Sequence, residues 1–154
     1  MTFEDFMTRV REKAAIVELT EGDGMGDNEL KRIVNDVIHA MAIQLINQKD
    51  PDMIKEVMVT YSMDKPSDWH STVGTYIIEE RDGKLYPRTA EWVRYYSLPT
   101  ELVAMDSVIP FKDYLIPTML TVATILIMIR NHIDVTQHLQ AAGTLVKGVV
   151  EQVV

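Results

Sequence analysis

The chain contains no cysteine among its 154 residues, which excludes disulfide bonds and thiolate metal sites and leaves the redox compartment undetermined. Residues 1–17 lack the continuous apolar stretch of a signal peptide, so we expect none. Basic residues are scarce, with 15 against 23 acidic residues and a net charge of −8. Nucleic-acid binders usually present a basic face, so we expect no sequence-specific nucleic-acid binding. The acidic excess is interpreted as a solvated surface, with a wall that lets DNA slide past, in passive contact only, as the alternative.

Motifs of known catalytic sites are also absent, including GxSxG and GxGxxG. The four histidines fall on different predicted elements, without metal-ligand spacing: His39, His70, His132 and His138. Glu79 and Glu80 are adjacent, so in a strand they point to opposite faces and form no acid–base couple. We therefore expect no enzyme, no catalytic residues, no cofactor and no metal.

Three other features could indicate a ligand, metal or catalytic site, but each has a simpler structural interpretation. The glycine-rich run Glu21–Asp27 lacks the spaced ligands of an EF-hand and the GK[ST] of a phosphate loop, so it is interpreted as an inter-helix loop. His39 lies near an apolar stripe, which favours a packed side chain over a ligand. Asp68, Trp69 and His70 place polar groups beside an aromatic ring, but a buried tryptophan closing a loop is the simpler interpretation.

The longest apolar stretch runs from Tyr114 to Ile129, sixteen residues without a charge. A membrane-spanning helix needs about 20 apolar residues, and this stretch also carries Pro117 and three threonines. We predict a buried helix, central in a bundle or at a subunit contact, and no membrane. Asp113 is the expected N-cap, and Arg130 falls in the last turn, where a cation is favoured.

Other elements follow from periodicity and turn residues. Apolar spacing predicts helices over 3–19, from Asp27 or Asn28 to about Gln48, and from Asp134 to Val153. Gly143 and Gly148 weaken the last helix relative to alanine. Two interpretations stay open: a close backbone approach that compensates for this, or a C-terminal helix that frays. Alternation predicts strands over 57–63, about 71–80, 85–86 and 91–98, the last with helix possible, and a type I′ turn at Asp82-Gly83. Residues 99–105 are predicted as one or two helical turns.

This order of elements predicts an α+β protein. We expect one domain of residues 1–154. Its helical bundle, with two N-terminal and two C-terminal helices, takes residues 1–50 and 108–154. A small antiparallel β region at 54–98 is inserted into that bundle.

Two stretches carry a resemblance to a known family. The segment Tyr95–Leu102, YYSLPTEL, is similar to a strand followed by Leu-Pro-x-acid in neck proteins of tailed phages. The segment Ile109–Leu115, followed by two closing helices, resembles their C-terminal half. The chain thus resembles head-to-tail adaptor, or connector, proteins, which form a ring under the portal. Its threonine-striped apolar helix and its acidity depart from that pattern, which leaves adaptor, stopper and tail-completion protein open.

The resemblance implies a structural virion protein, assembled in the host cytoplasm as a homo-oligomer ring. Its partners would be portal and tail or neck proteins, and DNA would pass through the ring. The expected contact residues lie on the apolar helix and on the β region: Leu115, Met119, Val122, Ile125, Ile129, Trp92, Tyr95, Asp82 and Gly83. Three alternatives stay open: a small cytoplasmic ligand-binding or regulatory module, an enzyme using Asp68, His70 or Glu79, and a membrane-associated protein.

Overall fold

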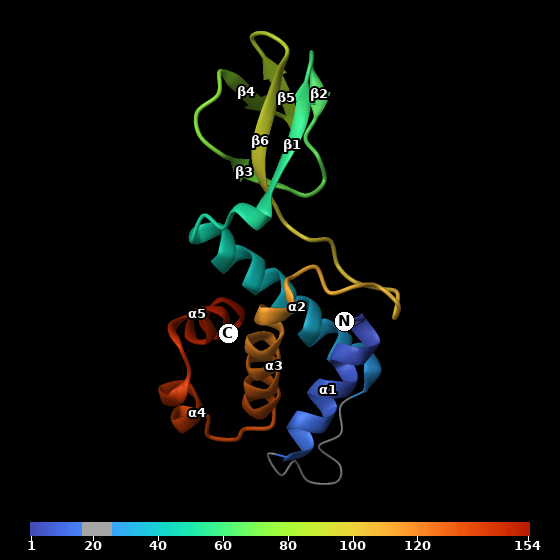
Figure 1. Ribbon diagram of the computed structural model, residues 1–154, viewed down its shortest axis with the longest axis vertical. Coiled ribbons are helices and arrows are strands. Elements are labelled where there is room, and N and C mark those ends of the chain that lie inside the picture. Colours follow the sequence, from blue (N-terminus) through green and yellow to red (C-terminus); the bar gives the residue numbers. More distant parts are fainter. Residues whose placement is uncertain (17–25) are drawn as a thin grey trace. The chain divides into compact units, whose positions relative to one another are not determined.

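A computed structural model describes residues 1–16 and 26–154. Within that part of the chain it contains five α-helices and two small antiparallel sheets, so the predicted α+β class is confirmed. The chain divides into two compact units. The helical unit combines residues 1–44 with 101–154, and the β unit comprises residues 45–100 (Figure 1). Most of the glycine-rich run Glu21–Asp27 and the end of the predicted helix 3–19 lie outside the described residues.

The helical unit has α3 between α1 and α5, in contact with both (Figure 1). Its helices are α1 (Phe3–Ile16), α2 (Asp27–Asn47), α3 (Ile116–Arg130), α4 (Thr136–Ala141) and α5 (Thr144–Val153). Thr2 caps α1, because the Asp5 backbone N–H donates to Thr2 Oγ1 at 3.1 Å.

The single helix predicted from Asp134 is wrong, since α4 and α5 are separate. Ala142 and Gly143 take extended backbone conformations, with ψ of 152° and 169°, which ends α4 and starts α5. The prediction of Asp113 as an N-cap is also wrong. Asp113 begins the short 3-10 helix η2 (Asp113–Leu115), and Leu115 occupies the N-cap position of α3 without a side-chain cap bond.

Helix α3 is the core helix that its composition predicts, with nine buried residues. The window Asp113–Arg130 is long and apolar enough to cross a membrane, but 56% of it is buried inside the protein, as in core helices of soluble proteins. Leu115, Met119, Val122 and Ile125 are buried in the chain itself, and Ile129 is partly buried. Because buried side chains are not accessible to another subunit, the expectation that these four form a subunit contact has no support in this conformation.

Within the helical unit, the segment 102–109 runs back to the start of the chain. The backbone N–H of Phe3 donates to Ser107 O at 2.7 Å, and that of Ile109 donates to Met1 O at 3.0 Å. The side chain of Asn35 on α2 pairs with the backbone of Leu102, accepting from its N–H at 2.8 Å and donating to its carbonyl at 3.0 Å. These bonds anchor residues 102–109, which contain one turn, closed by the Ser107 N–H bond to Ala104 O at 3.1 Å, and no helix, so the helical turns predicted over 99–105 are wrong.

The β unit consists of two three-stranded antiparallel sheets, ordered β1-β6-β3 and β2-β5-β4. The strands are β1 (Ile54–Val59), β2 (Met63–Asp64), β3 (Trp69–Thr72), β4 (Ile78–Arg81), β5 (Lys84–Pro87) and β6 (Glu91–Ser97). Val59, Leu85 and Val93 are fully buried and form their shared core. Strand β6 confirms the strand prediction at 91–98.

The strand predicted over 71–80 is wrong, because β3 and β4 are separate strands in different sheets. Gly74, with φ of 83°, lies between them, and this positive φ is unfavourable for other residues in an extended strand. The predicted hairpin turn is confirmed. Asp82 and Gly83 have φ of 51° and 74°, as a type I′ turn requires, and they connect β4 to β5.

Candidate functional site

One face of the β1-β6-β3 sheet is the strongest candidate for an interaction site. On β6, Val93, Tyr95 and Ser97 are buried, so Trp92, Arg94 and Tyr96 point to the opposite face. The register of β1 places its residues opposite these three. We call this surface the Trp92 face, and define it by three cross-strand pairs: Met58 with Trp92, Glu56 with Arg94, and Ile54 with Tyr96.

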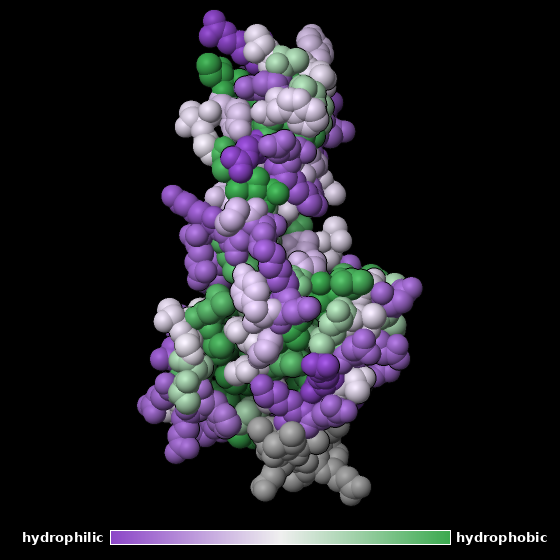
Figure 2. Space-filling model, in the orientation of Figure 1, coloured by the Kyte–Doolittle hydropathy of each residue, from purple (hydrophilic) through white to green (hydrophobic). Residues whose placement is uncertain are grey.

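The Trp92 face combines apolar side chains with one ion pair. Trp92 is 61% exposed, which is unusual for so large an apolar ring. Arg94 Nε lies 3.9 Å from Glu56 Oε1, and both side chains are largely exposed. Hydrophobic residues adjoin hydrophilic ones across the surface of the β unit (Figure 2). An exposed tryptophan beside arginine and tyrosine matches the composition of protein–protein contacts.

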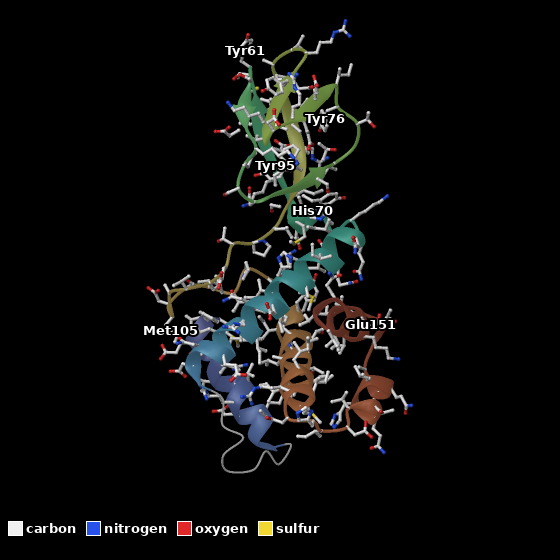
Figure 3. The ribbon with its side chains drawn as sticks, turned by 180° about the vertical axis from the view of Figure 1, so that it is seen from behind. Tyr61, His70, Tyr76, Tyr95, Met105 and Glu151 are labelled. Carbon is white, nitrogen blue, oxygen red and sulfur yellow. The ribbon has the colours of Figure 1, made fainter. Side chains whose placement is uncertain are left out.

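Tyr95 lies on the buried side of the same sheet and is only 5% exposed. Its hydroxyl donates to Asp68 Oδ1 at 3.0 Å, and Lys55 Nζ donates to Asp68 Oδ2 at 2.7 Å. The Trp69 ring stacks on Tyr95, with centroids 4.8 Å apart and planes at 17°. Figure 3 shows Tyr95 in the middle of the β unit, between the labelled Tyr76 and His70. Tyr95 stays a predicted contact residue, but in this structure its ring and hydroxyl are used inside the chain.

The Tyr95–Asp68 contact shifts both groups away from neutral pH. Burial raises the pKa of Asp68, but hydrogen bonds from Lys55 and Tyr95 and the charge of Lys55 oppose this, so its pKa is lowered overall. Burial, followed by the hydrogen bond and negative charge of Asp68, raises the pKa of Tyr95. General acid–base catalysis near pH 7 needs groups that titrate there. This arrangement instead fastens the loop before β3 to β1 and β6.

The three residues of the enzyme alternative have separate partners. Asp68 binds Lys55 and Tyr95, while His70 Nδ1 lies 2.9 Å from Ser71 Oγ. Glu79 is on β4 in the other sheet, where its Oε1 lies 3.4 Å from Arg81 Nε. Trp69 is half-buried and closes the loop, close to the predicted role. The structure thus does not gather these residues into one reaction site.

The tip of the β4–β5 hairpin is exposed, and Asp82 and Gly83 stay predicted contact residues. The Lys65 backbone N–H donates to Gly83 O at 2.9 Å, which holds the turn. Lys65 Nζ also lies 2.7 Å from Glu80 Oε2, and the Arg81 guanidinium lies 4.6 Å from the centre of the Tyr86 ring. A partner would therefore meet a turn whose backbone is already fixed.

His39 is exposed on α2, so its expected packing into the core is wrong. Across residues 1–16 and 26–154, no three His, Cys, Asp or Glu side chains are grouped to hold a metal ion. Comparisons with protein-family models, curated proteins and solved structures find no match for this chain. The resemblance to adaptor proteins therefore stays a prediction from the sequence.

Sequence reasoning identified Trp92 but missed the rest of its face. The alternation in EWVRYYS was the signal that could have found it, because residues 92, 94 and 96 of a strand share one side. The contribution of Met58 and Ile54 depends on the pairing register of β1 with β6, which the sequence does not specify.

Proposed function

We propose that this protein is a structural assembly protein, a ring-forming head-to-tail adaptor of a tailed phage that joins portal to tail and lets DNA pass. The single observation that carries an assembly role is the exposure of the large Trp92 ring on the Trp92 face, beside the exposed Arg94. Apolar rings left in water on a fixed sheet are favoured contact points for another protein. In this proposal the helical unit forms the bundle of the ring and the β unit reaches the neighbouring component.

The proposal places the contacts differently from the sequence prediction. Met119, Val122 and Ile125 are inside the core, so subunit contact would use the Trp92 face and the Asp82-Gly83 turn. The net charge of −8 supports the DNA-passage part of the proposal, because an acidic wall repels the phosphate backbone and prevents adhesion.

Mass photometry of the purified chain, alone and mixed with a tailed-phage portal, tests this proposal. We expect oligomers of the wild type that join the portal. Trp92→Ala should weaken this assembly by about 2 kcal/mol, or roughly 30-fold in affinity. The matched control is Tyr114→Ala, which removes an exposed aromatic ring from the helical unit. A chain that stays monomeric at every concentration and never joins a portal would contradict the proposal.

The alternative is a small cytoplasmic ligand-binding or regulatory module. It predicts a monomer whose melting temperature rises when one member of a metabolite panel is added. It also predicts that Trp92→Ala leaves the mass of the particles unchanged. The two proposals therefore give opposite results in the same pair of measurements.

A further inference from the structure

An apolar stripe in the C-terminal region runs through a break between two helices. Its residues follow one another at alternating spacings of four and three, as on one continuous helix: Val135, Leu139, Ala142, Val146, Val149 and Val153. In the structure this stripe is divided between α4 and α5, which Figure 1 shows as separate helices joined by a bend. Val146 and Val149 on α5 are buried, but no residue of α4 is. Only the α5 half of the stripe therefore contributes to the core.

The break consists of two residues with an extended backbone. Ala142 has φ of −78° and ψ of 152°, and Gly143 has φ of −71° and ψ of 169°. Alanine is the strongest helix former, and the φ of Gly143 is one that any residue adopts. A Cβ added at Gly143 would meet no atom within 4 Å. The break is therefore imposed neither by backbone strain nor by crowding at these two residues.

Backbone hydrogen bonding favours a single helix across the break. Gly143 is the N-cap of α5, and no side chain of the described chain caps that helix. The Ala142 N–H donates to Leu139 O at 3.3 Å, which closes the last turn of α4. In a joined helix, the N–H groups of residues 143–146 would donate to the carbonyls of residues 139–142. With six residues, α4 is also far below the length of about 12–15 at which isolated helices become stable.

Two features oppose this joining. Val135 and Leu139 are half-buried, so α4 and the residue before it would lose some packing if they moved. Gly143 would lie in a helix interior, where glycine is less favourable than alanine. Both effects are small, because no residue of α4 is fully buried and a single glycine is involved.

We propose that Ala142 and Gly143 form a hinge, and that α4 and α5 exchange with a single helix of residues 136–153. In the joined form α5 keeps its packing on α3, while α4 moves onto the axis of α5 and makes the apolar stripe continuous. The exchange takes place within the helical unit and does not depend on the proposed function. It is measured on the purified chain without a portal, so the two proposals can fail separately.

Two substitutions at Gly143 should shift this exchange in opposite directions. Gly143→Ala favours the helical conformation, and we expect the ratio of joined to broken form to rise about fivefold. Gly143→Pro should hold the broken form, because proline fixes φ at about −65°, close to the observed −71°. Proline also disfavours a helical conformation at Ala142, whose ψ of 152° it accommodates. It lacks the N–H that would donate to Leu139 O in the joined helix.

The test is NMR spectroscopy of the full chain. We expect the Ala142 carbon shifts of the wild type to be those of extended backbone, with relaxation dispersion at residues 139–146 from a minor joined form. Gly143→Ala should move the Ala142 shifts toward helical values and slow the amide hydrogen exchange of residues 143–146. Gly143→Pro should abolish the dispersion.

The matched control is Gln140→Ala, which introduces alanine at an exposed position of α4, before the hinge. Because residue 140 is helical in both forms, this variant should leave the Ala142 shifts and the dispersion unchanged. Circular dichroism should show that all variants are folded. Three results would overturn the proposal: a wild type without dispersion, extended Ala142 shifts that persist in Gly143→Ala, or dispersion that persists in Gly143→Pro.

Discussion

The Tyr95 hydroxyl donates a hydrogen bond to Asp68 Oδ1 at 3.0 Å, although 27 residues separate the two along the chain. This bond, with the Lys55 ion pair to the same carboxylate, joins three parts of the β unit: β1, the loop before β3, and β6. The stacked ring of Trp69 covers it on one side. A hydrogen bond to a charged group in such a site contributes about 1.5–3 kcal/mol.

Tyr95→Phe should therefore destabilise the protein by about 1–2 kcal/mol at pH 7, because Asp68 loses a donor. The pKa of Tyr95 is raised above its usual 10.0, so this stabilisation is complete below pH 10 and declines as pH rises through the raised pKa. Urea unfolding of both proteins between pH 7 and 11.5 measures it. Tyr61→Phe is the control, since that side chain is 82% exposed. A difference that stays constant to the highest pH would contradict the assigned role.

Asp68→Asn should cost about 1–3 kcal/mol at pH 7, because the Lys55 ammonium loses its anionic partner. The pKa of Asp68 is lowered from 3.8, so its contribution to stability is present above about pH 4 and is lost as pH falls through the lowered pKa. The difference between wild type and variant should shrink below pH 4 in acid titrations followed by tryptophan fluorescence. Asp64→Asn, at an exposed position on β2, should show no such convergence.

Gly83→Ala should destabilise the β unit by about 1 kcal/mol. Its φ of 74° is one that a side chain with a Cβ adopts only with strain, although no atom lies within 4 Å of the added methyl. Asp82→Asn is the control, because Asn-Gly also suits a type I′ turn, and it should change the stability by less than about 0.5 kcal/mol. Thermal unfolding of both variants checks this, and an unaffected Gly83→Ala would show that the turn relaxes without cost.

Gly148→Ala should leave the stability nearly unchanged, because two effects oppose each other. Alanine favours helix α5 by about 1 kcal/mol, but its Cβ would lie 3.0 Å from Gln44 Oε1. That contact displaces the Gln44 amide, which donates to Gly148 O at 3.3 Å. In a Gln44→Ala background the same substitution should stabilise the protein by about 1 kcal/mol. A double-mutant cycle measures this, and additive effects would contradict the opposed contact.

Met119→Ala should cost about 2–5 kcal/mol in the free energy of unfolding, because its fully buried side chain leaves a cavity in the helical unit. It should not alter the mass of any complex formed by the molecules that remain folded. Trp92→Ala should do the reverse, weakening assembly with little loss of stability. Denaturant unfolding and mass photometry on both variants check the contrast. Weakened assembly of a fully stable Met119→Ala protein would restore α3 as a contact surface.

Features set by neighbouring residues could be predicted from the sequence. The Asp82-Gly83 turn depends on backbone conformations that few residues tolerate, and the Thr2 cap depends on a hydroxyl three residues before Asp5. The apolar spacing of α2 also predicted its buried face, since Leu30, Val34 and Met41 are all buried. These patterns need no knowledge of what packs against them.

Features set by distant residues could not be predicted. The composition of α3 shows that its side chains must be buried. It does not show whether a side chain such as Met119 is buried by its own chain or by another subunit. The Asp68–Tyr95 bond joins residues whose proximity depends on the whole β topology. The strand period did allow one refinement. Trp92 and Tyr95 are three residues apart on a strand, so they point to opposite faces and cannot share one contact surface.

The return of residues 102–109 to the first residues of the chain has a consequence for biosynthesis. Helix α1, which carries the fully buried Phe3 and Phe6, is synthesised well before α3, which packs against α1 and begins only at Ile116. At about 5–20 residues per second the wait lasts on the order of seconds. The β unit, continuous from Leu45 to Thr100, is complete before α3 is made. The nascent chain must therefore shield two phenylalanine rings, by chaperone or by transient collapse, until translation reaches the C-terminal helices.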